Sequence, residues 1–373
     1  MKFPFTSEQL TKLHARIETP ALIVWQPNLE KNIADMQALA NRFDAALRPH
    51  TKTHKSPLFA QWQLNAGAKG ITVAKLSEAE VMAAHGIDDI FIANQITQVQ
   101  KLKRLRKLHE RIHLTVGLDN PRQIDLLRPF FKDASTPLNV RIEIDSGLKR
   151  CGVTVGNDLV ELAKAVARQP FLRLDGIFTH AGHVYAARSA AQVEAIGKQE
   201  GALMAGAKTL LQKNGLRIAT VSVGSTPTVP FSVRNPAVNE VRPGNYVFYD
   251  AMQIALHAAA PEQVSLFVLS TVVAHPVAGR LVIDAGSKAL HTDGAGVTGH
   301  FGLPVNIKGK VVRLSEEHGV LELPEESTLR LGDPVLLVPN HACAVANLFD
   351  VYYLINEALQ IKTVPVEARG KSQ

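Results

Sequence analysis

Eight short apolar segments alternate with longer amphipathic segments across the first two thirds of the chain. The short segments are rich in aliphatic and β-branched residues, as strands are. Strands that alternate with helices favour a parallel sheet, and eight such repeats favour a (β/α)8 TIM-type barrel over an open doubly wound sheet. The predicted strands are 46–48, 70–73, 89–93, 113–117, 139–144, 172–178, 220–223 and 240–241, and helices are predicted at 77–85, 97–108, 158–168 and 190–213.

The pattern changes after residue 250, where extended runs are separated by glycine, proline and charged turns. We therefore predict an α/β chain with a barrel over residues 20–250 and a mostly β C-terminal domain over residues 251–373, which residues 1–26 could join. Ser77 and Glu80 have the spacing of a capping box. The polar end of the chain, 366–373, is expected to fray. Strands are predicted at 21–25, 266–274, 280–284, 310–314, 319–323 and 334–338.

The composition is that of an ordinary globular protein and argues against a membrane protein. The chain has 373 residues, of which 46% are hydrophobic and 20% charged, so it can bury a large core. No apolar run approaches the roughly 20 residues that a membrane helix needs. The N-terminus lacks the apolar segment of a signal peptide. With only Cys151 and Cys343 there is no disulfide framework, which indicates a reducing, cytoplasmic compartment.

The net charge of +7 raises the question of nucleic-acid binding. The densest basic run, 101–111, contains leucines at every third position, at 102, 105 and 108. That spacing marks the buried face of a helix, so the cations occupy its solvated face. No aromatic residues interleave with the charges, and we predict no nucleic-acid partner. A positive potential suits anionic small molecules instead.

Chemically reactive residues gather where the predicted barrel strands end. Function in such barrels collects at the C-terminal ends of the strands. Lys52 follows the first strand, and a lysine held out of water there would be nucleophilic enough to form a Schiff base with an aldehyde cofactor. The plain alternative is that Lys52 and Lys55 are surface lysines before the next helix. The Gly-Ser-Thr loop after strand seven and the Pro-Gly-Asn turn after strand eight are typical phosphate-binding loops.

Together these motifs resemble the fold-type III pyridoxal-phosphate (PLP) enzymes, whose barrel is that of alanine racemase. The chain is most similar to the branch that holds D-serine dehydratase and D-threonine aldolase. The resemblance covers nearly the whole chain. It is carried by the segments 19–22, 48–55, 145–153, 180–185, 224–227, 242–250, 284–290 and 339–343.

The resemblance implies a role for each of these residues. Lys52, rather than Lys55, would carry the Schiff base with PLP and later act as the general base. Arg150 would pair with the phenolate oxygen of the cofactor, and His180 would pack beside its ring. The residues implied in phosphate binding are Ser225, Thr226, Gly244 and Asn245.

The partner of the pyridine nitrogen is left open between two residues. In alanine racemase an arginine at the position of Arg242 takes this role, whereas the dehydratase-like branch uses a tyrosine, for which Tyr185 is the candidate. The alternative for Arg242 is a salt bridge with Glu240 or Asp250.

A metal pair is predicted at His341 and Cys343, after the apolar run 334–339. In an extended segment residues two apart point the same way, so both side chains can face one ion. The alternative is a buried free cysteine beside a hydrogen-bonded histidine. The resemblance favours the metal, because the dehydratase-like enzymes carry His-x-Cys here, and thiolate ligation favours Zn²⁺ over Mn²⁺. His180 and His183 form a rival pair with chelating spacing.

These parts predict a lyase that eliminates water from a D-3-hydroxyamino acid such as D-serine or D-threonine, giving a 2-oxo acid and ammonia. D-threonine aldolase activity, which yields glycine and acetaldehyde, uses the same parts. A racemase would need a second base opposite Lys52, and a non-catalytic PLP-binding protein would not need the second domain. The resemblance also implies a homodimer with the active site near the subunit interface.

Overall fold

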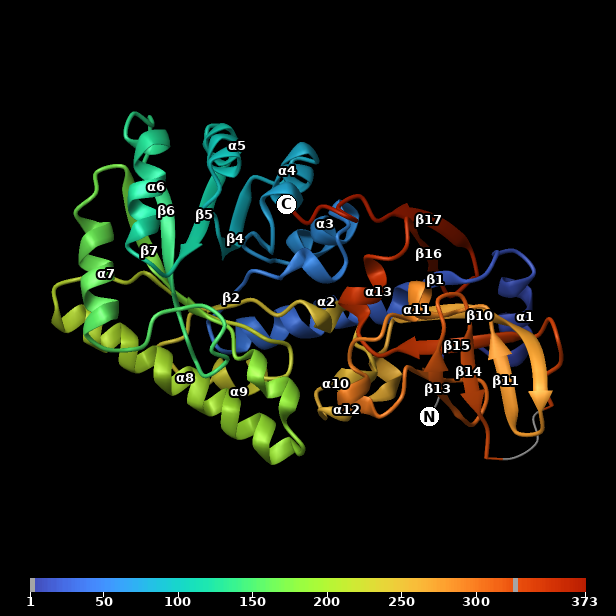
Figure 1. Cartoon of the computed structure of the whole chain (residues 1–373). Coiled ribbons are helices and arrows are strands. Elements are labelled where there is room, and N and C mark those ends of the chain that lie inside the picture. Colours follow the sequence, from blue (N-terminus) through green and yellow to red (C-terminus); the bar gives the residue numbers. More distant parts are fainter. Residues whose placement is uncertain (1–3, 325–327) are drawn as a thin grey trace. The chain divides into compact units, whose positions relative to one another are not determined.

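Eight parallel strands form a closed barrel in the computed structural model, which describes residues 4–324 and 328–373 (Figure 1). The strands follow the order β2-β9-β8-β7-β6-β5-β4-β3. The barrel closes between β2 and β3, where Leu47 accepts from the Lys69 amide at 2.9 Å and Pro49 from the Thr72 amide at 2.8 Å. The strands are β2 (Ala46–Leu47), β3 (Ile71–Val73), β4 (Asp89–Gln95), β5 (His113–Leu118), β6 (Leu138–Ile144), β7 (Leu172–Thr179), β8 (Thr220–Val223) and β9 (Glu240–Val241).

The barrel confirms the predicted fold class, and the strand bounds agree with the prediction to within one or two residues. Helices connect the strands, as parallel pairing requires. No bounds were predicted for α2, α3, α6 and α9. The helices of this part of the chain are α2 (Gln26–Arg42), α3 (Pro57–Asn65), α4 (Leu76–Ala84), α5 (Val99–His109), α6 (Arg122–Phe131), α7 (Asn157–Ala167), α8 (Ala190–Lys213) and α9 (Val229–Ser232).

The predicted capping box of Ser77 and Glu80 is wrong. The start of α4 is capped instead by Glu78, whose Oε2 accepts the Ala74 amide at 2.8 Å and the Lys75 amide at 3.1 Å. Glu80 and Ser77 both bind the guanidinium of Arg104. The helix begins one residue earlier than the pattern indicated, and this shift moves the capping position out of register.

A network of buried charges lies inside the barrel. Arg48 contacts Glu240 at 2.9 Å and Asp89 at 2.7 Å, while Arg141 contacts Glu240 at 2.5 Å and Asp175 at 2.7 Å. Burial alone would raise the pKa of Glu240, but Arg141 and Arg48 hold it well below its ordinary value. The network joins β4, β6, β7 and β9 to the end of β2, so paired charges fill much of this interior.

The rest of the chain builds a second, mostly β sheet. Its main path is β13-β14-β11-β10-β1-β16-β17, with β15 paired to β10 and β12. Strand β1 pairs antiparallel with β10 and parallel with β16, so it belongs to this sheet and not to the barrel. The strands are β1 (Ala21–Trp25), β10 (Leu266–Val277), β11 (Arg280–Ile283), β12 (Gly302–Pro304), β13 (Lys310–Leu314), β14 (Gly319–Glu322), β15 (Pro334–Pro339), β16 (Val351–Ile355) and β17 (Ile361–Pro365).

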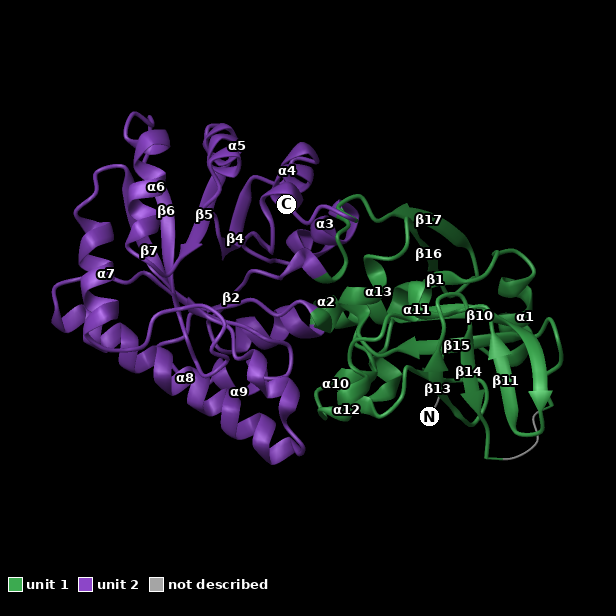
Figure 2. Ribbon diagram, viewed as in Figure 1, with its two compact units in different colours: residues 1–34, 53–56, 245–369 green, residues 35–52, 57–244, 370–373 purple. Residues whose placement is uncertain are grey.

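The chain divides into two compact units, coloured separately in Figure 2. Unit 1 holds the β sheet and comprises residues 1–34, 53–56 and 245–369. Unit 2 holds the barrel and comprises residues 35–52, 57–244 and 370–373. Within the described ranges, no helix combines the length and apolarity that a membrane span requires.

The C-terminal segment is not frayed, contrary to the expectation for 366–373. Val366 and Ala368 are buried within unit 1. The Ala368 amide donates to the Lys55 carbonyl at 3.0 Å. In unit 2, the Ser77 amide donates to the carbonyl of Gln373 at 3.0 Å. Two small apolar side chains among polar ones therefore anchor a segment that composition alone marked as loose.

Candidate active site

Lys52 lies in unit 2, in a single 3-10 turn, η1 (Thr51–Thr53), that follows the first barrel strand. The backbone before it is fixed by a parallel bridge from His50 to Thr72. The Lys52 side chain is half-buried. Its positive charge helps lower the pKa of His180, so the two groups interact at the C-terminal end of the barrel.

His180 follows β7 and is held as a neutral ring. Its Nδ1 lies 2.5 Å from the Gly224 carbonyl, so that nitrogen donates and Nε2 is the bare acceptor. Burial, with the nearby charge of Lys52, lowers the pKa of His180 to about 3. A neutral ring fits the predicted packing beside a cofactor.

Arg242 lies inside the barrel with both terminal nitrogens engaged. They donate to Ser222 Oγ and, at 2.6 Å, to the Thr179 carbonyl. The guanidinium carbon lies 5.2 Å from the ring centre of Phe178. Burial lowers the pKa of Arg242 to about 10. The alternative of an ion pair with Glu240 is wrong, because Glu240 binds Arg48 and Arg141 instead.

Arg150 and Tyr185 occupy the loops after β6 and β7. Arg150 has a side chain that is 56% exposed, 4.0 Å from Glu143, so it can turn towards a ligand. Tyr185 lies half-buried in η2 (Gly182–Ala186). Because both terminal nitrogens of Arg242 already donate to protein oxygens, a contact from either of them to the pyridine nitrogen would require one of these hydrogen bonds to break.

The predicted phosphate loop connects β8 to α9. Ser225 and Thr226 are both buried, and Ser225 Oγ lies 2.8 Å from Thr228 Oγ1. A Cβ on Gly224 would lie 3.1 Å from the Arg242 carbonyl, so glycine permits this close approach. Gly244 follows β9, next to β8 in the barrel. Hydroxyls, backbone amides and three cationic side chains in one unit fit an anionic cofactor.

Asn245 lies in unit 1 and is tied to a buried aspartate. Asn245 Nδ2 donates to Asp250 Oδ2 at 2.5 Å, and the same oxygen accepts the Ala342 amide at 2.8 Å. Burial raises the pKa of Asp250. Asn245 Oδ1 is buried without a hydrogen-bond partner among the described residues. Asp250 therefore connects a predicted phosphate ligand to the segment that carries the metal pair.

His341 and Cys343 come together in unit 1, but not in an extended segment. Strand β15 ends at Pro339, and the short helix α13 (Ala342–Ala346) begins directly after His341. The prediction of extended geometry is wrong here, because the chain turns into the helix. The two side chains nevertheless interact, and despite burial the Cys343 and Asp293 groups raise the pKa of His341 to about 11.

Two neighbours of this pair were not predicted. Asp293 Oδ2 lies 2.6 Å from His341 Nδ1, which leaves Nε2 for an ion. Thr53 Oγ1 lies 3.1 Å from Cys343 Sγ, and Thr53 directly follows Lys52 in the chain. A histidine oriented by a carboxylate, beside a cysteine, is a donor set that fits zinc. Neither Asp293 nor Thr53 has a spacing signal that would have revealed it.

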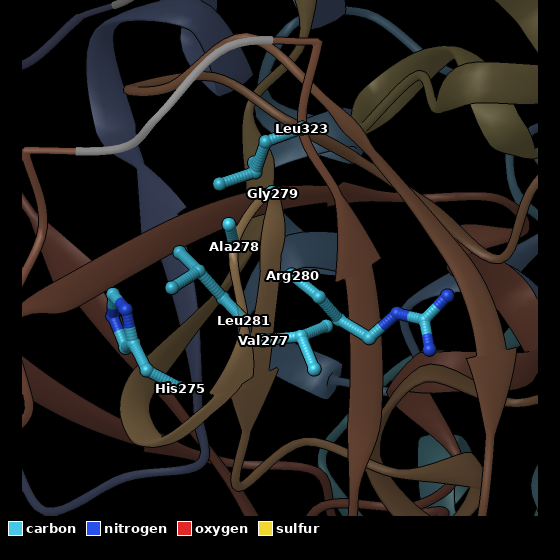
Figure 3. Close-up of a pocket in the computed structure, with 7 residues that line it drawn as sticks. All are labelled: His275, Val277, Ala278, Gly279, Arg280, Leu281 and Leu323. Carbon is cyan, nitrogen blue, oxygen red and sulfur yellow. The ribbon is translucent and has the colours of Figure 1, made fainter.

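Two other features consist of residues that were not predicted as ligands. In unit 2, ligand atoms of Asp119, Glu143 and Cys151 lie within 4.8 Å of one another, but the two carboxylates already accept from Gly152 and Gln95. In unit 1, a pocket on the β10–β11 hairpin contains none of the predicted site residues (Figure 3). It is lined by His275, Val277, Ala278, Gly279, Arg280, Leu281 and Leu323.

Two family models match consecutive parts of the chain. The alanine racemase N-terminal domain matches residues 26–251. A serine dehydratase domain matches residues 265–355. The first match covers the barrel strands, and the second covers the part of unit 1 that carries Asp293, His341 and Cys343.

Curated relatives match over almost their whole length. D-threonine aldolase of an Arthrobacter species is 32% identical, covering 96% of this chain and 94% of the relative. D-threo-3-hydroxyaspartate dehydratase of Delftia sp. is 33% identical, covering 90% of this chain and 93% of the relative. D-serine dehydratase of Dictyostelium discoideum is 29% identical, covering 92% and 95%.

A solved structure agrees with this assignment. D-threonine aldolase from Filomicrobium marinum superposes with a TM-score of 0.90 at 33% identity, covering 96% of this chain and 98% of the other. The barrel and the mostly β unit are thus shared with this aldolase. The chain belongs to the fold-type III PLP enzyme family that joins an alanine racemase N-terminal domain to a serine dehydratase domain.

Proposed function

We propose that this protein is a PLP- and metal-dependent lyase that eliminates water from a D-3-hydroxyamino acid such as D-serine or D-threonine. The products would be a 2-oxo acid and ammonia. One observation carries the proposal: Cys343 contacts Thr53, the residue that follows Lys52. In this proposal residues 20–250 bind the cofactor and residues 251–373 carry the metal pair.

PLP, when bound, withdraws electrons from the substrate and so acidifies its Cα–H bond. We assign the other tasks to residues of this chain. Lys52 would hold the cofactor through its side-chain amine and would serve as the general base that accepts the Cα proton. Arg150 would neutralise the phenolate oxygen, and the neutral His180 ring would pack beside the cofactor. Ser225, Thr226, Gly244 and Asn245 bind the phosphate.

A divalent metal, when bound, acts as a Lewis acid on the β-hydroxyl group of the substrate. His341 and Cys343 would hold it, and Zn²⁺ suits this nitrogen and sulfur pair better than Mn²⁺. Relatives support the assignment. A D-threo-3-hydroxyaspartate dehydratase has been solved with a histidine replaced and with a cysteine two positions later replaced, the latter in a metal-free form.

Aldolase activity is the second candidate. Two of the proteins that match over most of the chain are named D-threonine aldolases. Here Cα–Cβ would be the bond that breaks, and the products of D-threonine would be glycine and acetaldehyde. The resemblance of the His341 and Cys343 motif to the His-x-Cys of the dehydratase-like branch favours elimination over this reaction.

Product identification decides between the two reactions. Purified protein is incubated with D-serine, D-threonine and D-3-hydroxyaspartate, with and without EDTA, and products are identified by mass spectrometry. We expect pyruvate from D-serine, loss of activity with EDTA and recovery with Zn²⁺. Glycine with acetaldehyde from D-threonine, and no 2-oxo acid, would establish the aldolase instead.

We also propose that the protein works in the cytoplasm as a homodimer. The presence of only two cysteines, 151 and 343, supports a reducing compartment. The dimer is supported by the family alone. Light scattering should give about twice the mass of one chain, which is 40.5 kDa, and a monomeric mass at micromolar concentration would contradict it.

A further inference from the structure

Glu200 is the one charged residue on the buried face of α8, and none of the recognised motifs contains it. Its neighbours on that face are apolar or glycine, and Glu200 is only 2% exposed. A carboxyl group is rarely placed in a core without a specific task, because its burial is costly. The buried residues of the helix are Val193, Gly197, Glu200, Gly201, Met204, Ala207 and Leu211.

One oxygen of Glu200 holds the two loops that carry the predicted cofactor ligands. Oε1 accepts the amide of Ala181, after β7, at 3.3 Å. It also accepts the amide of Gly224, after β8, at 3.4 Å. The Gly224 carbonyl in turn accepts from His180. Glu200 therefore fixes the peptide groups beside both His180 and the phosphate loop.

The carboxyl group of Glu200 also lies next to a hydroxyl group of that loop. Oε2 is buried without a hydrogen-bond partner among the described residues. Burial raises the pKa of Glu200, and this effect is larger than the opposite effect of the Thr228 hydroxyl, which lies beside the carboxyl and lowers the pKa. Thr228 Oγ1 is 2.8 Å from Ser225 Oγ. A row of three polar groups thus runs from the helix core to a predicted phosphate ligand.

Two glycines bring the loop to this carboxyl. A Cβ on Gly197 would lie 2.9 Å from the Thr228 carbonyl. A Cβ on Gly201 would lie 2.9 Å from the Ser232 carbonyl. Since Gly197 and Gly201 flank Glu200, their lack of side chains lets the segment from Thr228 to α9 pack directly on α8 around the carboxyl.

We propose that Glu200 is a positioning residue that orients the Ser225 hydroxyl as a donor to the cofactor phosphate. A neutral carboxylic acid would donate from Oε2 to Thr228, Thr228 would donate to Ser225, and the Ser225 proton would point to the phosphate. If Glu200 were ionised, Thr228 would donate to Glu200 and Ser225 would donate to Thr228. Ser225 would then face the anionic phosphate with a lone pair. This inference rests on the proposed function, because it assumes that the loop binds PLP.

The test measures phosphate recognition without chemistry. The PLP-free protein is titrated calorimetrically with pyridoxine 5′-phosphate and with pyridoxine, which share the ring but cannot bond to Lys52. The ratio of the two affinities reports the phosphate loop alone. Glu200→Gln keeps the donor and acceptor pattern of a neutral acid, whereas Glu200→Ala removes it. Thr228→Val and Thr228→Ser form a second pair that removes or keeps the hydroxyl.

We expect Glu200→Gln and Thr228→Ser to keep the ratio of the unchanged protein within about threefold. Glu200→Ala and Thr228→Val should lower it by about tenfold or more, as expected for a weakened hydrogen bond to a charged group. If Glu200→Ala does not fold, the Thr228 pair decides. An unchanged ratio in Thr228→Val, or a loss in Glu200→Gln as large as in Glu200→Ala, overturns the inference. If the unchanged protein binds pyridoxine 5′-phosphate no more tightly than pyridoxine, the proposed function is overturned instead.

Discussion

Lys52 and Lys55 give a direct prediction at the scale of single residues. Lys52→Arg keeps the positive charge, but a guanidinium does not form the bond to PLP. We expect this variant to lose the yellow absorbance of bound PLP and at least about 10³-fold of kcat, as for loss of a covalent and general-base group. The measurements are the visible spectrum after dialysis and the rate with D-serine.

Lys55→Arg is the matched control, because Lys55 lies in the same basic cluster but is not assigned to the cofactor. It should keep both the absorbance and most of the activity. If Lys52→Arg keeps the absorbance and Lys55→Arg loses it, PLP is attached to Lys55 and not to Lys52. The charge is the same in both variants, so electrostatics alone could not explain a difference.

Asp293 predicts how firmly His341 holds a metal. Its carboxylate orients Nδ1 of the histidine ring at 2.6 Å, so Asp293→Asn should weaken Zn²⁺ affinity by about 10–100-fold. The affinity is measured by competition with a chelating dye on the PLP-free protein. Asp350→Asn, at an aspartate 78% exposed in a pair with Arg369, is the control and should leave the affinity unchanged. Equal affinity in both variants would show that Asp293 does not support the site.

At the scale of elements, the glycines of α8 separate packing from helix propensity. Gly201→Ala would place a Cβ 2.9 Å from the Ser232 carbonyl, so α9 must move, and we expect about 1–3 kcal/mol of destabilisation. Gly206 lies in the same helix, and a Cβ at this position meets no atom within 4 Å. Gly206→Ala should therefore stabilise the folded protein by up to about 1 kcal/mol. Urea unfolding of both variants checks the sign, and destabilisation by both would show that close packing on α9 is not the cause.

The elements that the sequence predicted best are those with a strong local pattern. Strand β8 and helix α8 have the predicted bounds, since a β-branched run and a long amphipathic repeat define them. Helix α3 was expected after Lys55 but could not be delimited, because its apolar residues do not repeat with a helical period. The turn from β15 into α13 was missed because His341 and Cys343 satisfy an extended pattern equally well.

The candidate site could be predicted only where residues directly follow strands. Lys52, His180 and Ser225 were found because the barrel places strand ends together. Asp293, Asp250 and Glu200 were not found as supporting residues, since their partners are distant in the chain. The contacts of Asp293 with His341 and of Asp250 with Ala342 span 48 and 92 residues. Only tertiary structure reveals such supporting groups.

At the scale of the whole molecule, the charges inside the barrel predict how stability depends on pH. Burial opposes ionisation of Glu240, but Arg141 and Arg48 hold its pKa below the ordinary value of 4.5. Unfolded chains take up a proton at this residue near that value, whereas the folded protein resists until a lower pH. The contribution of Glu240 to stability is therefore complete above about pH 4.5 and is lost as the pH falls further.

Glu240→Gln isolates this effect. The variant leaves Arg48 and Arg141 without their shared carboxylate, so its free energy of unfolding at pH 7 should fall by about 3–5 kcal/mol. The gap between the variant and the unchanged protein should narrow as the pH drops below 4.5, because only the unchanged protein loses the Glu240 contribution there. Urea unfolding at a series of pH values from 7 to 3.5 measures the gap. A gap that stays constant over this range would mean that Glu240 is not held ionised by the two arginines, and that the barrel interior tolerates its protonation.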